Sequence, residues 1–204
     1  MNSAVLELAY LPNVIWFKNF LKHETIFIER EENFVKSSFR NRCEIAGPTG
    51  KQILSVPVVG GRDHHQLYKE VRIAFDNNWN NKHWQSIRSA YGSAPYFEFY
   101  ADKFQPLFEK RFEFLFDLNI ELLYAILHIF KVRKCFDFTS IYETAGGEIF
   151  HLRTGSAIPC RHTGIKSLAE YFQVFEGRNG FIHNLSIIDV IFNLGPETKN
   201  YLQK

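Results

Sequence analysis

The chain has 204 residues, of which 46% are hydrophobic and 16% are aromatic, with 21 Phe against a single Met. This composition is typical of a globular protein with a sizeable core, and it excludes a disordered or fibrous one. The formal net charge is +2, from 24 basic and 22 acidic residues, so nothing general attracts the chain to nucleic acid or an anionic membrane. Any basic site must therefore be local.

The cysteine pattern and the apolar windows indicate a cytoplasmic protein. An odd number of widely spaced thiols is a poor disulfide framework and favours a reducing compartment; they are Cys43, Cys135 and Cys160. Residues 1–13 lack a basic region followed by an apolar run, so we expect no signal peptide. The most apolar window, 118–130, contains Glu121 and His128 and falls short of the ~20 residues that a membrane span needs.

The first elements along the chain predict a βαβ unit. Ala4–Tyr10 has the pattern of a buried strand, and Thr25–Glu29 has that of a second strand. Between them we expect a helix over Val14–Lys22, with Asn13 as its N-cap. A helical crossover of this length joins parallel strands, so the unit predicts an open α/β sheet.

A hairpin follows. Two extended runs, Arg40–Ala46 and Gln52–Val58, flank the strong turn signal Gly47–Gly50. Pro57 indicates that the second strand is at an edge or broken there. The alternating pattern of Val71–Phe75 predicts a further strand.

The remaining chain is mostly helical by pattern. Phe136–Gly164 alone is assigned to strand and loop. Helices are expected over Asn80–Tyr91, over Tyr96–Val132 as one kinked helix or two, over Lys166–Phe175, and over the apolar segment that Ser186 begins and Gly195 ends. We therefore expect one α/β domain over residues 1–204. It should have a small, partly parallel sheet with an added antiparallel hairpin, flanked by helices and a Phe-rich helical segment.

The string "KSSFRNR", residues 36–42, is the first candidate for binding chemistry. On a strand, Arg40 and Arg42 would share a face, and two guanidiniums can hold a phosphate or carboxylate through bidentate bonds. Lys36 would add a donor. The alternative is a solvated strand face with Glu44 as an ion-pair partner.

His83 is the second candidate. It stands four residues after Trp79 on the expected helix, so the two rings share a face. It could act as a general base or hold a substrate hydroxyl. The alternative is a partly buried histidine packed on Trp79.

The loop Tyr10–Asn13 after the first strand is the third candidate. Ligands of α/β sheets gather beyond the carboxyl ends of strands, and a helix N-terminus attracts anions, so Tyr10 and Asn13 are candidate substrate contacts. No G-x-G-x-x-G or P-loop string is present, which argues against a dinucleotide or Walker-type site. The alternative is an ordinary turn.

Other signals are weaker. Asp63–His65 lies in a Gly-rich stretch without a further ligand that we can place, so we expect no metal and no cofactor. Cys160 and His162 are close in sequence but fall on a loop of undefined form.

The apolar helix that Ser186 begins carries a few polar residues that need an explanation. Ser186, Asp189 and Asn193 form a narrow polar stripe on a helix that is otherwise apolar and should be buried. A buried carboxylate needs a cation or several donors. We predict that Ser186 caps the helix, that Asp189 bonds back toward the cap, and that Asp189 meets an arginine, either Arg40 or Arg42. Capping leaves Asn184 and Asn193 unexplained.

These strings resemble the WbqC-like family of bacterial proteins. The resemblance is carried by "AYLPNVIWF", "KSSFRNR" and "NLSIIDVIFNLGPE" in colinear order, and it extends from near residue 9 to near residue 202. Two departures stand out: many relatives read Q-P-x-Y-L-P-W where this chain reads "ELAYLPNV", and His183 stands where Pro is expected. The resemblance implies a place in surface-polysaccharide and O-antigen pathways, with acyl or aminoacyl transfer to an amino sugar as a plausible reaction.

Two functions are expected from this reading. In the first, a cytoplasmic transferase acts on a nucleotide-linked sugar with an activated acyl or aminoacyl donor. Its catalytic residues would be His83 and Asp189; its substrate contacts would be Tyr10, Asn13, Lys36, Arg40, Arg42, Asn184 and Asn193. In the second, a non-catalytic ligand-binding or partner protein of the same pathway uses Arg40, Arg42, Asp189 and Asn193 as a buried network. One open pocket lined by these side chains would favour the enzyme, and sealed, paired side chains would favour the network. Nucleic-acid binding lacks a basic stripe.

Overall fold

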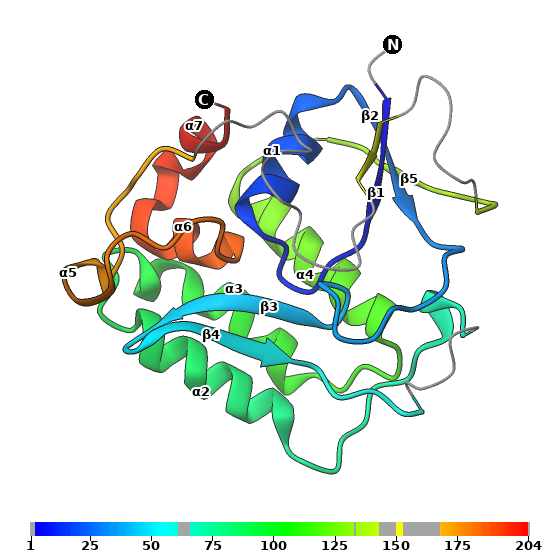
Figure 1. Cartoon of the computed structure of the whole chain (residues 1–204), viewed down its shortest axis with the longest axis horizontal. Helices are drawn as coiled ribbons and strands as arrows, with labels where there is room; N and C mark the ends of the chain where they lie inside the picture. The colour runs from blue at the N-terminus through cyan, green and yellow to red at the C-terminus, as the bar shows by residue number, and fades with distance from the viewer. Residues whose placement is uncertain (1–2, 61–65, 133, 143–149, 153–167, 204) are drawn as a thin grey trace.

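A computed structural model describes residues 3–60, 66–132, 134–142, 150–152 and 168–203. A four-stranded parallel sheet has the order β5-β2-β1-β6. Its strands are β1 Ser3–Glu7, β2 Thr25–Glu29, β5 Asp137–Phe138 and β6 Phe150–Leu152. Figure 1 shows this sheet at one side of the molecule, and a separate hairpin crosses in front of helices α2 and α3. The expected combination of a small parallel sheet, an antiparallel hairpin and flanking helices is confirmed.

The βαβ unit forms as the local signals predict. Helix α1, Val14–Lys22, begins after Asn13, whose Oδ1 accepts a hydrogen bond from Trp16 N at 2.9 Å. β1 pairs with β2 in parallel, with Ser3 opposite Thr25. β1 is shorter than expected, because the chain beyond Glu7 leaves the sheet: Tyr10 N donates to Phe39 O at 2.8 Å.

The hairpin consists of β3, Arg42–Gly47, and β4, Gly50–Ser55. Gly50 has φ of +110°, a conformation that favours glycine and explains the tight turn. β4 ends before Pro57, as expected. Arg40 lies in a turn before β3, so the prediction that it alternates with Arg42 on one strand face is wrong.

The predicted strand Val71–Phe75 does not form. The segment makes only two isolated bridges, of Ile73 with Val58 and of Arg72 with Phe114. Ile73 N and Val71 O instead bond to the backbone around 113–115, just before helix α4. The short helix η1, Tyr68–Glu70, precedes the segment.

The Phe-rich region forms two helices rather than one kinked helix. After α2, Trp79–Tyr91, come α3, Phe97–Glu109, and α4, Leu115–Ile129. Phe104 and Phe108 are buried, and the ring of Phe104 contacts that of Phe192. The aromatic periodicity therefore marks core packing. No helix among the described residues is long and apolar enough to cross a lipid bilayer.

The C-terminal part differs from expectation at one place. Residues 168–175 are not helical, so the described part of the predicted helix Lys166–Phe175 is wrong. Backbone and side-chain bonds explain this: Gln173 Oε1 accepts from Ile182 N at 2.8 Å, and Tyr201 OH donates to Ala169 O at 2.8 Å. The elements that follow are α5 Glu176–Asn179, α6 Ile187–Leu194, η3 Gly195–Glu197 and α7 Thr198–Gln203. The segment Phe136–Gly164 contains β5 and β6, while Asp63–His65, Cys160 and His162 lie outside the described residues.

Candidate functional site

The N-terminus of α1 is closed by the C-terminal part of the chain. Its first three backbone N–H groups all have acceptors: Val14 N bonds Leu185 O at 3.1 Å, Ile15 N bonds Asn184 Oδ1 at 3.0 Å, and Trp16 N bonds Asn13 Oδ1. Asn184 reaches this position with φ of +57°. Asn13 and Asn184 thus cap a helix. The anion site that we expected at this helix end has no spare N–H among these three groups; substrate contact by either side chain stays a prediction.

Ser186 belongs to the same junction. Its hydroxyl donates to Leu11 O at 2.9 Å and its backbone N donates to Glu44 O at 2.8 Å. It precedes α6 at the N-cap position, yet its side chain makes no capping bond. The predicted side-chain cap is therefore wrong, because the hydroxyl joins α6 to the loop before α1 instead.

Asp189 is buried and held by uncharged donors. Tyr171 OH donates to its Oδ2 at 2.5 Å, and Gln173 Nε2 donates to the same oxygen at 3.0 Å. Burial raises the pKa of Asp189 to about 6, and hydrogen bonds from Tyr171, Tyr91 and Gln173 hold it from rising further. Asp189 forms no ion pair among the described residues, so the prediction that it meets an arginine is wrong. The bond back to the cap residue Ser186 is made by the backbone of Asp189, whose N donates to Ser186 O at 3.0 Å, and not by its carboxylate.

Asn193 completes the polar stripe of α6. Its Nδ2 donates to the backbone oxygen of Asp189, one turn earlier, at 2.8 Å, and the residue is buried. The stripe is thus a set of internal contacts on a buried helix. The predicted roles of Asp189 and Asn193 toward a substrate stay predictions.

Tyr10 and His83 form a buried pair. Tyr10 OH lies 2.8 Å from His83 Nδ1, and the Trp79 ring stands edge-on to the imidazole with centroids 5.1 Å apart. Burial lowers the pKa of His83 to about 4, with a hydrogen bond to the Ser55 backbone opposing it. Burial also raises the pKa of Tyr10 well above its usual value. The imidazole is therefore neutral near pH 7, and in the tautomer protonated on Nε2 its Nδ1 accepts a hydrogen bond from the Tyr10 hydroxyl.

This pairing constrains the general-base hypothesis for His83. A base must reach the proton that it removes, and Nδ1 is already occupied by the Tyr10 hydroxyl. The shared face of Trp79 and His83 is confirmed. The catalytic role of His83 stays a prediction that requires the Tyr10 bond to exchange.

Arg40 is an anchor at the carboxyl end of β1. It is 3% exposed. Its Nε and Nη2 bond the two oxygens of Glu32 at 2.8 and 2.5 Å, and Nη2 lies 2.9 Å from Glu7 Oε2. Burial alone would lower the pKa of Arg40, but the bond to Glu32 and the charge of Glu7 raise it above its usual value. With Nη1 also 3.3 Å from Ser38 Oγ, most of its donors are used inside the fold.

The turn around Arg40 is fixed from several sides. Asn119 Nδ2 donates to Arg40 O at 2.7 Å, and Asn41 Nδ2 donates to Val56 O at 3.0 Å. Ser37 holds a positive φ of 64°, which is unusual for a residue with a Cβ. Strained residues held by surrounding contacts cluster at functional sites, so this turn is the first candidate for one.

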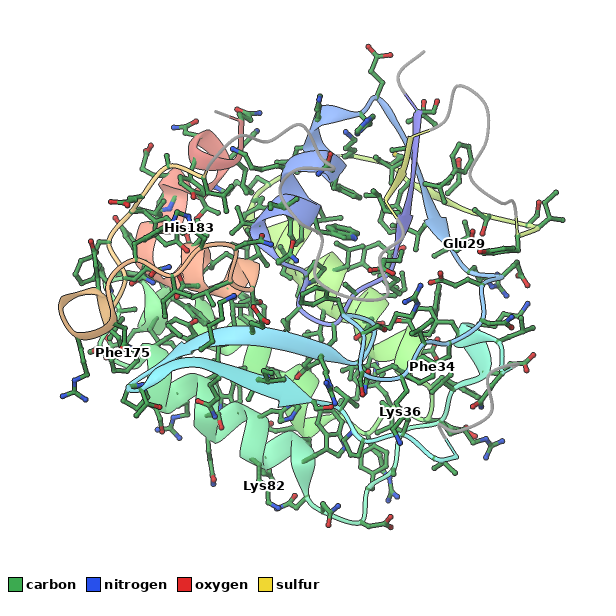
Figure 2. The ribbon with its side chains drawn as sticks, viewed as in Figure 1. Glu29, Phe34, Lys36, Lys82, Phe175 and His183 are labelled. Atoms are coloured by element: carbon green, nitrogen blue, oxygen red, sulfur yellow. The ribbon has the colours of Figure 1, made fainter. Side chains whose placement is uncertain are left out.

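Arg42 and Lys36 flank the anchor and remain unpaired. Among the described residues, no hydrogen bond or ion pair engages either side chain, although Arg42 is half-buried and its Nε is fully covered. Glu44, the partner expected if Arg42 were merely structural, binds Lys51 Nζ at 2.8 Å instead. Lys36 is exposed on the loop between Phe34 and the start of β3 (Figure 2). We call Lys36–Arg42 the basic turn.

The candidate residues do not converge on one open pocket. Their printed contacts define separate groups: Arg40 with Glu7 and Glu32, Tyr10 with His83, and Asp189 with Tyr171 and Gln173. The Tyr10–His83 pair adjoins the basic turn, because Ser55 is the cross-strand partner of Arg42 and its backbone bonds His83, and because Tyr10 N donates to Phe39 O at 2.8 Å. Within the described part of the chain, no group of three or more His, Cys, Asp or Glu could hold a metal ion.

Sequence reasoning missed the anchoring residues. Glu7 is a lone carboxylate in the apolar run Ala4–Tyr10, so it had the same signature that drew attention to Asp189. That signature marks Glu7 as a buried acid in need of a cation. Tyr171 and Gln173 lay in a segment expected to be helical and carried no comparable signal.

Taken together, these features define a mixed α/β protein in which a parallel βαβ sheet and a hairpin hold a basic turn between them. The chain belongs to the WbqC-like protein family, whose model matches residues 9–154. The "KSSFRNR" string lies inside the matched range, whereas "NLSIIDVIFNLGPE" lies beyond it.

A curated relative extends the likeness further. The chain is 26% identical over 225 residues to "Uncharacterized protein Rv1507c" of Mycobacterium tuberculosis (strain ATCC 25618 / H37Rv), covering 98% of this chain and 96% of that protein. No solved structure matched the chain. The comparisons therefore give the family without an activity.

Proposed function

We propose that the protein binds a nucleotide-linked sugar through the basic turn and transfers an acyl or aminoacyl group to an amino sugar in bacterial surface-polysaccharide synthesis. The observation that carries the binding part is Arg42, a half-buried guanidinium without an anionic partner among the described residues. The pathway is the one that the resemblance to the WbqC-like family implies.

The physical argument concerns desolvation. A partly buried cation loses water and gains nothing in return unless an anion arrives. A phosphate accepts two parallel bonds from a guanidinium and so offsets that loss, with Lys36 as a nearby point charge. Arg40 does not take part directly, because Glu7 and Glu32 already occupy it. It holds the turn in place.

His83 is the residue best placed for the transfer chemistry. In this step the sugar amine bonds the acyl carbon, while the bond from that carbon to the sulfur or oxygen of the activated donor breaks. The neutral imidazole can take the amine proton once Tyr10 yields Nδ1, and it returns that proton to the leaving thiol or hydroxyl group. His83 and Arg42 both meet the strand end at Ser55. Among the described residues the Asp189 carboxylate is held by Tyr171 and Gln173, so the proposed transfer assigns it no step.

Titration calorimetry with UDP-linked amino sugars tests the binding part. Arg42→Ala is expected to weaken affinity about tenfold or more, since charge-assisted bonds contribute roughly 1.5–3 kcal/mol. Arg72→Ala is the matched control, because Arg72 is exposed and pairs with Glu113 away from the basic turn. Equal affinities for the Arg42 and Arg72 variants, or no binding of any nucleotide sugar by the native chain, would refute the proposal.

A second candidate function is a non-catalytic binding protein of the same pathway. Its support is that Arg40, Asp189 and Asn193 are sealed in the fold and bonded to protein groups. One assay distinguishes the two candidate functions. The sugar is incubated with the protein and acyl-CoA or aminoacyl donors, and mass spectrometry measures whether the sugar gains an acyl group. An acylated sugar that His83→Gln no longer forms supports the transferase. Binding without any product supports the second function.

A further inference from the structure

A groove of about 730 Å³ lies beside the end of α4, away from the basic turn. One wall is a stripe of α4 that includes Tyr124 and His128, and the other is formed by residues beyond the helix, among them Val132 and Cys135. Buried Leu127 forms part of its apolar lining. The Phe136 ring stacks on Tyr124 with centroids 5.6 Å apart, which places aromatic surface at the Tyr124 end. The volume is in the range of small-molecule sites.

The two ends of the groove differ in chemical character. Tyr124 lies within α4, whereas Lys131 lies beyond the end of the helix at Ile129, so an aromatic side chain and a lysine stand at different ends of the groove. Lys131 and His128 have no side-chain partner among the described residues. Lys134 is already engaged, since its ammonium bonds the Leu21 and His23 carbonyls at the end of α1. The unpaired side chains of Lys131 and His128 therefore lie at one end of the apolar groove.

Lys131 occupies a costly backbone position. It follows α4 with φ of +51°, and its N bonds His128 O at 3.1 Å while Val132 N bonds Leu127 O at 3.2 Å. This helix ending favours glycine, which has no Cβ to strain. A lysine there is unfavourable for folding alone, and its side chain lines the groove. Such an outlier points to a role in binding.

We propose that this groove is a second ligand site, which binds a soluble medium-chain fatty acid with its carboxylate on Lys131 and His128 and its chain toward Tyr124. The largely apolar lining favours an alkyl chain over a polar sugar, and the cationic end favours an anion over a neutral alcohol. The site is distinct from the basic turn. The start of α4 bonds Val71 near η1, whereas its end meets the end of α1.

Cys135 provides a readout for binding of octanoate. It is exposed, lines the groove and carries a free thiol, whereas Cys43 is buried. Octanoate is expected to slow maleimide alkylation of Cys135, followed by peptide mapping on the full chain. Hexanoate should require roughly fifteenfold more ligand for equal protection, because it lacks two methylenes and each buried methylene contributes about fourfold. Octanol should protect weakly.

Lys131→Gly separates binding from folding. The variant relieves the left-handed position, so its melting temperature should rise, while the octanoate needed for protection should increase about tenfold. Asn78→Gly is the matched control: it relieves another positive φ, of 48°, outside the groove and should leave octanoate protection unchanged.

Three results would overturn the proposal. They are equal protection by octanol and octanoate, unchanged protection in Lys131→Gly, and protection that appears only with phosphatidylglycerol vesicles or with rising protein concentration. The last would assign the groove to a membrane surface or to a second copy of the chain. None of these outcomes depends on nucleotide-sugar binding at the basic turn.

Discussion

Asp189→Asn should remove a pH dependence of folding that the native chain carries. In the folded protein burial raises the pKa of Asp189 to about 6, against an ordinary value of 3.8. The folded state therefore holds the proton more tightly than the unfolded state does. Stability falls as pH rises between these two values and stays low above the folded pKa.

The size of the effect follows from the shift. A difference of about two pKa units corresponds to about 3 kcal/mol, at 1.36 kcal/mol per unit. Asparagine fits the site without a charge, since its oxygen can accept from Tyr171 and Gln173. At neutral pH the variant should be more stable than the native chain by an amount of this order.

Urea unfolding of both chains from about pH 8 to about pH 4.5 measures the difference directly. The stability gap should be largest above pH 7 and shrink steadily as the native carboxyl takes up its proton. All other titrating groups are common to both chains and cancel. A gap that stays constant over this range would show that Asp189 is not perturbed, and the account of α6 as a helix burying a carboxylate on neutral donors would fail.

Two further substitutions test the buried contacts. Arg40→Met takes the guanidinium away from two buried carboxylates and should lower the free energy of unfolding by about 3–5 kcal/mol, whereas Lys51→Ala, at an exposed pair, should change it by less than about 1 kcal/mol; similar losses in urea unfolding would contradict the anchoring role. Tyr10→Phe deprives His83 Nδ1 of its donor and should cost about 1–3 kcal/mol in the same measurement, and no loss would mean that the pair is not formed in solution.

The elements that the sequence predicted well depend on neighbouring residues. Asn13 caps α1 through a bond three residues along, and Gly50 permits the hairpin turn at its own position. Such signals are complete within a few residues. The segment around Gln173 does not form the expected helix, because the Gln173 side chain bonds Ile182 and Asp189, which lie farther along the chain.

Partners of buried polar groups could not be predicted in the same way. The sequence marks Asp189 and Arg40 as groups that need partners, but it does not rank the candidates. Arg40 took Glu7 and Glu32 because the turn before β3 lies at the end of β1. Asp189 is bonded by the uncharged donors Tyr171 and Gln173. Tertiary geometry decides which partner each buried side chain has. The predicted pairing of Asp189 with an arginine was wrong because the sequence does not contain that geometry.

The capping of α1 has a consequence for how the molecule is made. Ile15 N meets Asn184 Oδ1 across 169 positions of sequence, and Val14 N meets Leu185 O over a similar separation. During synthesis, the residues of α1 leave the ribosome long before Asn184 and Leu185, which cap the helix, are added to the chain. Contacts so distant in sequence slow folding, because a long loop must close before they form. The amino-terminal helix should therefore be among the last parts of the nascent chain to become stable.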